Sequence, residues 1–200
     1  MTGKSEKSGS DSNYWALTLL LGFLCLPALA LLGFFTAGAV LSFPAQAPRN
    51  VDVVVVVGGG DTDRYVRGRD LVLGGYSQRL VLIEPNAPDL ADAQRSVPGV
   101  QVWDDFQPRN SWAEASHVRT RMQAEGLRSV MVVSEPPHLL RLRYTWGSVF
   151  RGSDLSYTLI ASAPPWWSTW RWWQHPRAAA FVDSEFLKLG YYVARYRFGW

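Results

Sequence analysis

The feature that most constrains this chain is a run of 37 consecutive residues without a charge, residues 12–48. Within it, residues 15–43 read WALTLLLGFLCLPALALLGFFTAGAVLSF and are apolar apart from a few Ser and Thr. A bilayer core about 30 Å thick is crossed by roughly 20 helical residues, so this segment is long enough to span it with tilt. It shows no polar stripe, which a helix in a soluble core normally has. The sequence therefore predicts one transmembrane helix over residues 15–43.

The residues that flank this segment indicate whether it is an uncleaved anchor or a cleaved signal peptide. The Ala-Gln-Ala sequence at 45–47 resembles a signal-peptide cleavage site, but Pro48 follows it and the apolar run exceeds the roughly 7–15 residues of a signal peptide. We therefore expect an uncleaved signal anchor with the lipid bilayer as its partner. Lys4 and Lys7 precede the segment, which by the positive-inside rule makes residues 1–14 a short cytoplasmic tail and puts residues 49–200 outside the cytoplasm.

The charges after the gap exclude several classes of protein. Residues 49–200 hold 18 positive and 15 negative side chains, which are scattered, so no nucleic-acid footprint is indicated. His117, His138 and His175 lack metal-ligand spacing, and the single cysteine, Cys25, lies in the apolar segment, so no metal site is predicted. A Gly-x-Ser-x-Gly elbow, the mark of one class of serine hydrolase, is missing from the sequence.

Residues 49–200 alternate between strand and helix patterns. The run VDVVVVV at 51–57 is typical of a central strand buried on both faces. Between residues 85 and 99 we expect only a short helix, interrupted by Pro88 and Pro98. The other strands are expected at 78–84, 100–103, 129–133 and 155–161, and the other helices at 62–73, 112–125, 138–150 and 178–198. This order predicts an α/β domain with a Rossmann-like, mostly parallel five-stranded sheet and helices on both faces.

In such a sheet the loops at the carboxyl ends of the strands form the binding crevice. In the first of these loops, Gly58, Gly59 and Gly60 precede a helix, an arrangement that lets backbone amides approach an anion. A plain tight turn is the alternative, because the full dinucleotide fingerprint is not met. Arg64, in the first turn of that helix, is a candidate for binding phosphate or carboxylate, or else a solvated arginine. Glu84 ends the second strand, where it suits a ribose hydroxyl or a surface position.

The later loops supply the remaining candidates. Ser111 and Glu114 fit a capping box at a helix start, and both are also site candidates, Glu114 as an acid or base. Asn110, just before the expected cap, is a candidate ligand-binding residue.

The loop after the fourth strand carries the most distinctive candidates. It contains Ser134 and leads into His138 and Arg141, which are three residues apart on one helical face. An arginine beside His138 favours the neutral imidazole, which suits a base or a hydrogen-bond partner, although a lone histidine is often structural. Ser134 and Arg141 are candidate ligand-binding residues.

Five tryptophans crowd residues 166–173 (WWSTWRWW). Three interpretations are open: the rings dip into the lipid headgroup layer, stack on a sugar, or pack over the sheet.

At these loops the sequence resembles the YdcF-like family over about residues 51–192. The resemblance rests on the strand that runs into the glycine turn at 58–60, on Arg64, on RNSWAE at 109–114, which is similar to the family's S-x-N-T-x-E-N, and on VVSEPPHLLR at 132–141, which is similar to V-T-x-x-x-H-x-x-R. Two departures stand out: Glu84 lies in IEPN at 83–86, where the family has a Ser-Gly-Gly turn, and Ser111 replaces a threonine.

The resemblance implies a Rossmann-like sheet with its pocket at the strand ends. For anchored members it implies a bacterial inner-membrane location and a part in envelope integrity or peptidoglycan-related metabolism, and for a soluble relative S-adenosylmethionine binding. One hypothesis is therefore a single-pass envelope-biogenesis protein that binds an anionic, glycan or lipid-linked ligand. The alternative is a nucleotide- or S-adenosylmethionine-binding enzyme that faces the cytoplasm, and whether the site catalyses a reaction stays open.

Overall fold

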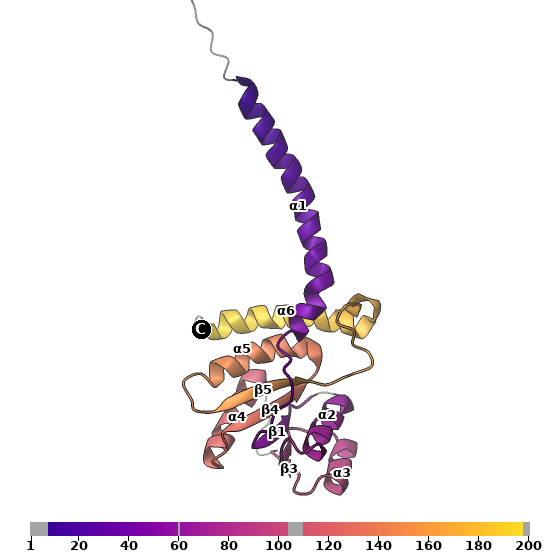
Figure 1. Cartoon of the computed structure of the whole chain (residues 1–200), viewed down its shortest axis with the longest axis vertical. Coiled ribbons are helices and arrows are strands. Elements are labelled where there is room, and N and C mark those ends of the chain that lie inside the picture. Colours follow the sequence, from indigo (N-terminus) through magenta and orange to yellow (C-terminus); the bar gives the residue numbers. More distant parts are fainter. Residues whose placement is uncertain (1–7, 60, 104–109, 198–200) are drawn as a thin grey trace, which may run out of the picture. The chain divides into compact units, whose positions relative to one another are not determined.

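The computed structural model describes residues 8–59, 61–103 and 110–197, drawn as coloured ribbon in Figure 1. Gly60 and residues 104–109, which belong to two of the expected crevice loops, lie outside the described residues. The chain divides into two compact units, Met1–Ala37 and Gly38–Trp200.

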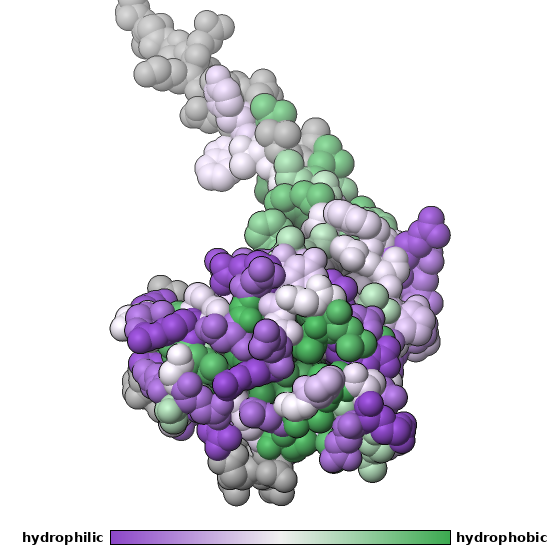
Figure 2. All heavy atoms as spheres, turned by 60° about the horizontal axis from the view of Figure 1, so that its bottom comes forward, coloured by the Kyte–Doolittle hydropathy of each residue, from purple (hydrophilic) through white to green (hydrophobic). Residues whose placement is uncertain are grey.

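Helix α1 (Ser8–Ser42) provides the whole described part of the first unit and contains Pro27. Its stretch Leu17–Ser42 has a mean hydropathy of 2.4 and is, by length and composition, long and apolar enough to cross a membrane. The hydroxyls of Thr18 and Thr36 donate to the carbonyls of Tyr14 and Leu32, four residues earlier, so these polar groups are satisfied within the helix. In a space-filling view α1 is largely hydrophobic, whereas hydrophilic residues are spread over the α/β unit (Figure 2). The prediction of one long apolar N-terminal helix is confirmed.

The second unit is built on a five-stranded sheet in the order β3-β2-β1-β4-β5, with every pair parallel. The strands are β1 (Val53–Val56), β2 (Leu80–Leu82), β3 (Gln101–Val102), β4 (Ser129–Ser134) and β5 (Ser156–Ala161). This is the Rossmann strand order. From β1 the chain first adds β2 and β3 on one side of the sheet and then β4 and β5 on the other, which leaves a crevice between β1 and β4 at the carboxyl ends of the strands. The predicted fold class is confirmed, and the sheet is wholly parallel.

Helices cover both faces of the sheet. They are α2 (Thr62–Leu73), α3 (Ala87–Ser96), α4 (Ser111–Ala124), α5 (Leu139–Val149) and α6 (Pro176–Arg197), with short 3-10 helices η1 (Pro136–His138) and η2 (Trp172–Gln174). Val53 and Val55 of β1 belong to the core cluster with α4 and α5, whereas Val54 and Val56 belong to the cluster with α2 and α3. Because successive strand residues point to opposite faces, a strand buried on both sides must be apolar throughout, which explains the valine run.

The expected interruption at Pro88 was wrong. Pro88 does not interrupt α3 but lies in its first turn, where a missing amide hydrogen costs nothing, and Asn86 caps the helix by accepting from the Asp89 amide at 2.8 Å. The expected helix at 138–150 is confirmed as α5, and η1, which contains Pro136 and Pro137, precedes it.

The segment between α1 and β1 covers the free edge of β5. The Gln46 amide donates to the Leu159 carbonyl at 2.9 Å, and the Leu159 amide donates to Gln46 Oε1 at 3.1 Å. An uncovered edge strand is prone to pair with other chains, so this contact protects the sheet.

The tryptophan-rich loop before α6 is mostly packed. Trp166 and Trp172 are buried, and Trp166 stacks on Phe181 with 5.2 Å between ring centroids. Trp172 lies against the last turns of α1, where a Cβ at Gly38 would approach its Cδ1 to 2.7 Å. Trp170, in contrast, is 63% exposed. Packing therefore accounts for part of the cluster, and Trp170 keeps the interfacial interpretation open.

Candidate functional site

A cavity of about 450 Å³ lies at the carboxyl ends of β1, β2 and β4. It is bordered by the glycine loop after β1, the start of α4, the start of α5 and one face of α6. Its lining residues are Gly58, Gly59, Glu84, Asn110, Ser111, Glu114, His138, Arg141, Lys188, Tyr191 and Tyr192. The structure thus brings together eight of the residues that sequence reasoning nominated, and α6 adds the last three.

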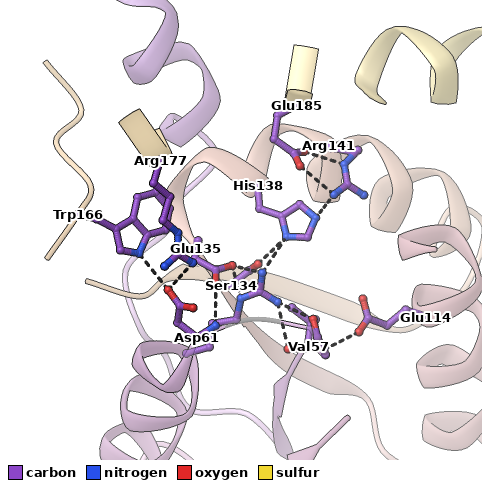
Figure 3. Close-up of polar contacts among 12 residues, drawn as sticks. Val57, Asp61, Glu114, Ser134, Glu135, His138, Arg141, Trp166, Arg177 and Glu185 are labelled. Carbon is purple, nitrogen blue, oxygen red and sulfur yellow. Dashed lines mark hydrogen bonds and ion pairs between the residues drawn. The ribbon is translucent and has the colours of Figure 1, made fainter. Parts of the chain in front are cut away.

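His138 is held by the protein at both ring nitrogens (Figure 3). Arg141 Nη2, which can only donate, contacts Nε2. Nδ1 lies 2.9 Å from Ser134 Oγ and 3.5 Å from Arg64 Nη2. Burial, and then the charges of Arg141 and Arg64, hold the pKa of His138 well below its usual range. The imidazole is therefore neutral, as expected, and its contacts make it a support for Arg141 rather than a free base.

Arg141 is the centre of a buried network. Its Nε and Nη2 form a fork on the Glu185 carboxylate at 2.7 and 3.2 Å, and Nη1 donates to Ser111 Oγ at 2.6 Å. Lys188 Nζ donates to Glu185 Oε1 at 3.0 Å. With His138 included, these described contacts use four of the five guanidinium N–H bonds, which leaves one on Nη1 for a ligand.

Arg64 is turned inward and does not line the large cavity. It is only 4% exposed, forms an ion pair with Glu135, and donates from Nη1 to the carbonyls of Val57 and Gly58 at 3.2 and 2.7 Å. Burial lowers its pKa to about 10, which leaves it charged at neutral pH. Arg64 therefore fixes the end of β1 and the glycine loop from below.

Two backbone amides around the glycine turn are already bonded to carboxylates. The Gly58 amide donates to Glu114 Oε1 at 2.9 Å, and the Asp61 amide donates to Glu135 Oε1 at 3.2 Å. Gly59 has a φ of +69°, which favours glycine, and lines the cavity. The turn therefore binds carboxylates of its own chain at the positions where we expected an external anion.

Glu114 is a buried acid on the cavity wall, 6% exposed. Burial raises its pKa to about 7, against the lowering effect of the Gly58 amide and nearby arginines. Protonated and ionised forms are therefore both populated near neutral pH, as is useful for a proton donor or acceptor.

The expected capping box was wrong. Asn110 caps α4, with Oδ1 accepting from the Ala113 amide at 2.9 Å, while the Ser111 amide donates to the Tyr192 hydroxyl at 3.2 Å. Glu114 bonds to the Gly58 amide across the crevice instead of turning back to its own helix. Asn110 therefore has the structural role that sequence reasoning denied it, and it also borders the cavity.

Glu84 ends β2 with a left-handed φ of 46°, is exposed, and lines the cavity. A Cβ at Gly58 would lie 3.2 Å from Glu84 Oε2, so the two loops are in close contact. Left-handed backbone is strained for a residue other than glycine.

A second polar cluster connects the start of α2 to the start of α6. Asp61 Oδ2 accepts from Trp166 Nε1 at 3.0 Å and pairs with Arg177 at 2.5 Å (Figure 3). Arg177 also lies 4.4 Å from the centroid of the Trp166 ring and lowers the pKa of Asp61. This cluster holds the tryptophan loop on the rim of the glycine turn.

Sequence reasoning missed the residues of α6 as site residues. Glu185, Lys188 and Tyr192 follow one another at helical spacings of three and four, which places them on one face, and that pattern was available. Glu135 gave no comparable signal, because its partner Arg64 is distant in sequence.

Within residues 8–59, 61–103 and 110–197 no group of three His, Cys, Asp or Glu side chains is placed to hold a metal ion. No family model and no curated protein matches the chain. Among solved structures, it is similar to 2R,3R-butanediol dehydrogenase from Bacillus subtilis, with 10% identity and a TM-score of 0.35, over 75% of this chain and 44% of the other. The chain thus spans less than half the length of that dehydrogenase.

Proposed function

We propose that this chain is a single-pass, membrane-anchored protein of the YdcF-like type, with a role in the biogenesis or integrity of a bacterial cell envelope. Its α/β unit faces the extracytoplasmic side of the inner membrane and binds an anionic ligand, a phosphorylated glycan or lipid-linked carrier. The observation that carries the proposal is the cavity in which Arg141, Lys188 and Glu114 meet beside two tyrosines, on a chain with one long apolar helix.

The free polar groups of the cavity suit an anion. One N–H of Arg141 and the half-exposed ammonium of Lys188 offer positive charge, and protonated Glu114 offers an O–H donor. Tyr191 and Tyr192 add aromatic surface of the kind on which sugar rings stack. A volume of about 450 Å³ lies within the usual range for small-molecule sites.

Contacts of residues 38–46 support an uncleaved anchor. Leu41 is 1% exposed and Gln46 pairs with the edge of β5, both within the α/β unit. Cleavage after Ala47 would remove these contacts from the α/β unit and destabilise it. A signal peptide that is removed in the mature protein makes no such contacts with the folded domain.

Topology is tested with reporters fused to the carboxyl terminus of the full chain. Alkaline phosphatase is active only outside the cytoplasm, so its fusion is expected to be active. Green fluorescent protein does not fluoresce when it is exported in unfolded form, so its fusion is expected to be dark. A fluorescent fusion with inactive phosphatase contradicts the proposed orientation.

Ligand binding is tested by calorimetry on the full chain in detergent, with N-acetylglucosamine 1-phosphate and a short polyprenyl phosphate as probes. Loss of the Lys188 charge in Lys188→Ala is expected to weaken binding about tenfold, the value of one good charge-assisted contact. Arg195→Ala, which removes an exposed α6 charge outside the cavity, serves as the matched control. Equal affinities for wild type and Lys188→Ala, or no heat with either probe, contradict the proposal.

One observation favours the alternative, a nucleotide- or S-adenosylmethionine-binding enzyme facing the cytoplasm. Glu84 lines the cavity at the end of β2, the place from which Rossmann-type sheets hold a ribose. The fit is partial, because the Gly58 and Asp61 amides near the turn already bond to Glu114 and Glu135. Heat with S-adenosylmethionine or adenine nucleotides that disappears in Glu84→Gln supports this alternative, and no heat in wild type contradicts it.

A further inference from the structure

Helix α6 has an inner face that is buried against the rest of its unit. Ala178, Val182, Glu185 and Tyr192 are between 0% and 6% exposed. Their spacings of four, three and seven residues place them on one side of the helix. This side carries Glu185, the partner of Arg141, so the helix cannot rotate without breaking the site.

The outer face of α6 is apolar and exposed. Leu187 and Tyr191, one turn apart, are 77% and 61% exposed. Ala180 and Ala194, each seven residues from Leu187, extend the same stripe and are also exposed. A soluble surface helix normally turns polar residues outward, so this stripe calls for an apolar partner.

A basic stripe borders the apolar one. Arg177, Lys188 and Arg195 are separated by eleven and seven residues, which aligns them along one flank of α6, and all three are exposed. Asp183 is an acid on the opposite flank of the apolar stripe. An exposed apolar stripe flanked by Lys and Arg is the pattern of a helix that lies in the interface of an anionic membrane.

Chain continuity indicates which surface α6 meets. The loop just before α6 lies against the end of the apolar helix, since a Cβ at Gly38 would overlap the Thr169 carbonyl and approach Trp172. Exposed aromatic side chains lie on this part of the unit, Trp170 at 63% and Phe43 at 87%. Val40 and Phe43 also border an apolar groove of about 270 Å³ with Leu140 of α5. Aromatic rings are enriched where a chain leaves the bilayer.

We propose that the outer face of α6, together with Trp170 and Phe43, rests on the anionic headgroup layer of the membrane that α1 crosses. Lys188 of the basic stripe and Tyr191 of the apolar stripe also line the ligand cavity. The cavity therefore opens at the level of the lipid headgroups. Its ligand then carries its phosphate at the membrane surface, as a lipid-linked carrier does. This inference rests on the proposed anchoring by α1 and specifies the source of the ligand.

The test uses the full chain with Cys25→Ser, which removes its single cysteine, and one new cysteine carrying a nitroxide label. The labels are placed by Leu187→Cys on α6, Leu29→Cys in the apolar helix and Arg151→Cys on an exposed polar loop. Each protein is reconstituted in vesicles of phosphatidylcholine and phosphatidylglycerol. Collisions of the label with oxygen, which concentrates in lipid, and with a water-soluble nickel complex are then measured.

The label at 187 is expected to lose accessibility to the nickel complex relative to 151. The protection should grow with the phosphatidylglycerol fraction and weaken in high salt or with Arg195→Glu. If 29 reports lipid while 187 is as accessible as 151, this inference is overturned and the anchor stands. If 29 itself reports water, the proposed anchoring fails. Strong spin–spin broadening between labels at 187 shows a second copy on this face, which also overturns the inference. Native tryptophan fluorescence confirms that each variant is folded.

Discussion

Glu114 and His138 line the same cavity but titrate with opposite effects on stability. Burial raises the pKa of Glu114 to about 7, so the native state keeps a proton that the unfolded chain has lost above its ordinary value of 4.5. The pKa of His138 lies well below its ordinary 6.5, so below about pH 6.5 the unfolded chain binds a proton at this residue that the native state does not bind. Stability is therefore lost through Glu114 as pH rises from about 4.5 through about 7, and through His138 as pH falls below about 6.5.

The contribution of Glu114 is isolated by Glu114→Gln, which still accepts from the Gly58 amide. Relative to this variant, the wild type is expected to lose up to about 3 kcal/mol of unfolding free energy between pH 4.5 and 7.5, from about 1.4 kcal/mol per pKa unit. Urea unfolding followed by tryptophan fluorescence at several pH values measures the difference. Asp183→Asn, which changes an exposed carboxylate of α6, should keep the wild-type slope. Parallel curves for wild type and Glu114→Gln would show that Glu114 ionises normally.

At this scale the sequence predicted positions better than roles. Most cavity residues lay in loops that a parallel sheet brings to one edge, so alternating elements were enough to nominate them. Their bonding partners come from elsewhere in the chain: Arg64 pairs with Glu135, and Arg141 with Glu185. Such pairings depend on how helices cross the sheet, which local patterns do not encode. The same limit explains why Arg64, expected either to bind an anion or to be solvated, is instead buried.

At the scale of elements, α2 packs unusually close to the sheet. Gly68 is buried on its inner side, and a Cβ there would overlap Val56 Cγ2 of β1. Gly68→Ala is therefore expected to destabilise the protein by about 1–3 kcal/mol, because overpacking outweighs the gain in helix propensity. The shift of the urea midpoint measures it.

Gly190→Ala is the matched control, since Gly190 is also helical but a Cβ there meets nothing within 4 Å. It should stabilise the protein by about 0.5–1 kcal/mol through helix propensity alone. Destabilisation of equal size at both positions would show that close packing of α2 is not the cause.

The elements themselves were largely predictable from periodicity and breakers. Residues 62–73 were expected as a helix closed by Gly74, and α2 has those bounds. The errors came at helix starts, where a shift of one residue decides which side chain caps. Asn110 caps α4 in place of Ser111, because Ser111 contacts Arg141 and Tyr192 instead. Asn86 caps α3, so that Pro88 lies in the first turn and does not interrupt the helix. Both outcomes depend on tertiary contacts.

At the scale of the molecule, the uncharged gap correctly separated an apolar helix from a charged α/β unit. It did not indicate that the end of the helix is part of that unit. The compact unit begins at Gly38, inside α1, because the last turns of the helix pack against the tryptophan loop. By hydropathy, residues 38–42 simply continue the apolar helix. Only their packing shows that they also belong to the α/β unit.

This shared turn makes a testable difference between two leucines of one helix. Leu41 is 1% exposed in the α/β unit, so Leu41→Ala is expected to lower its unfolding free energy by about 2–5 kcal/mol through lost burial and a residual cavity. Leu29 is 62% exposed in the first unit, so Leu29→Ala should leave the unfolding of the α/β unit unchanged. Urea unfolding of the full chains in detergent, followed by tryptophan fluorescence, compares them. If both variants unfold like the wild type, residues 38–42 act only as a tether, and the structural argument against cleavage after Ala47 loses its support from Leu41.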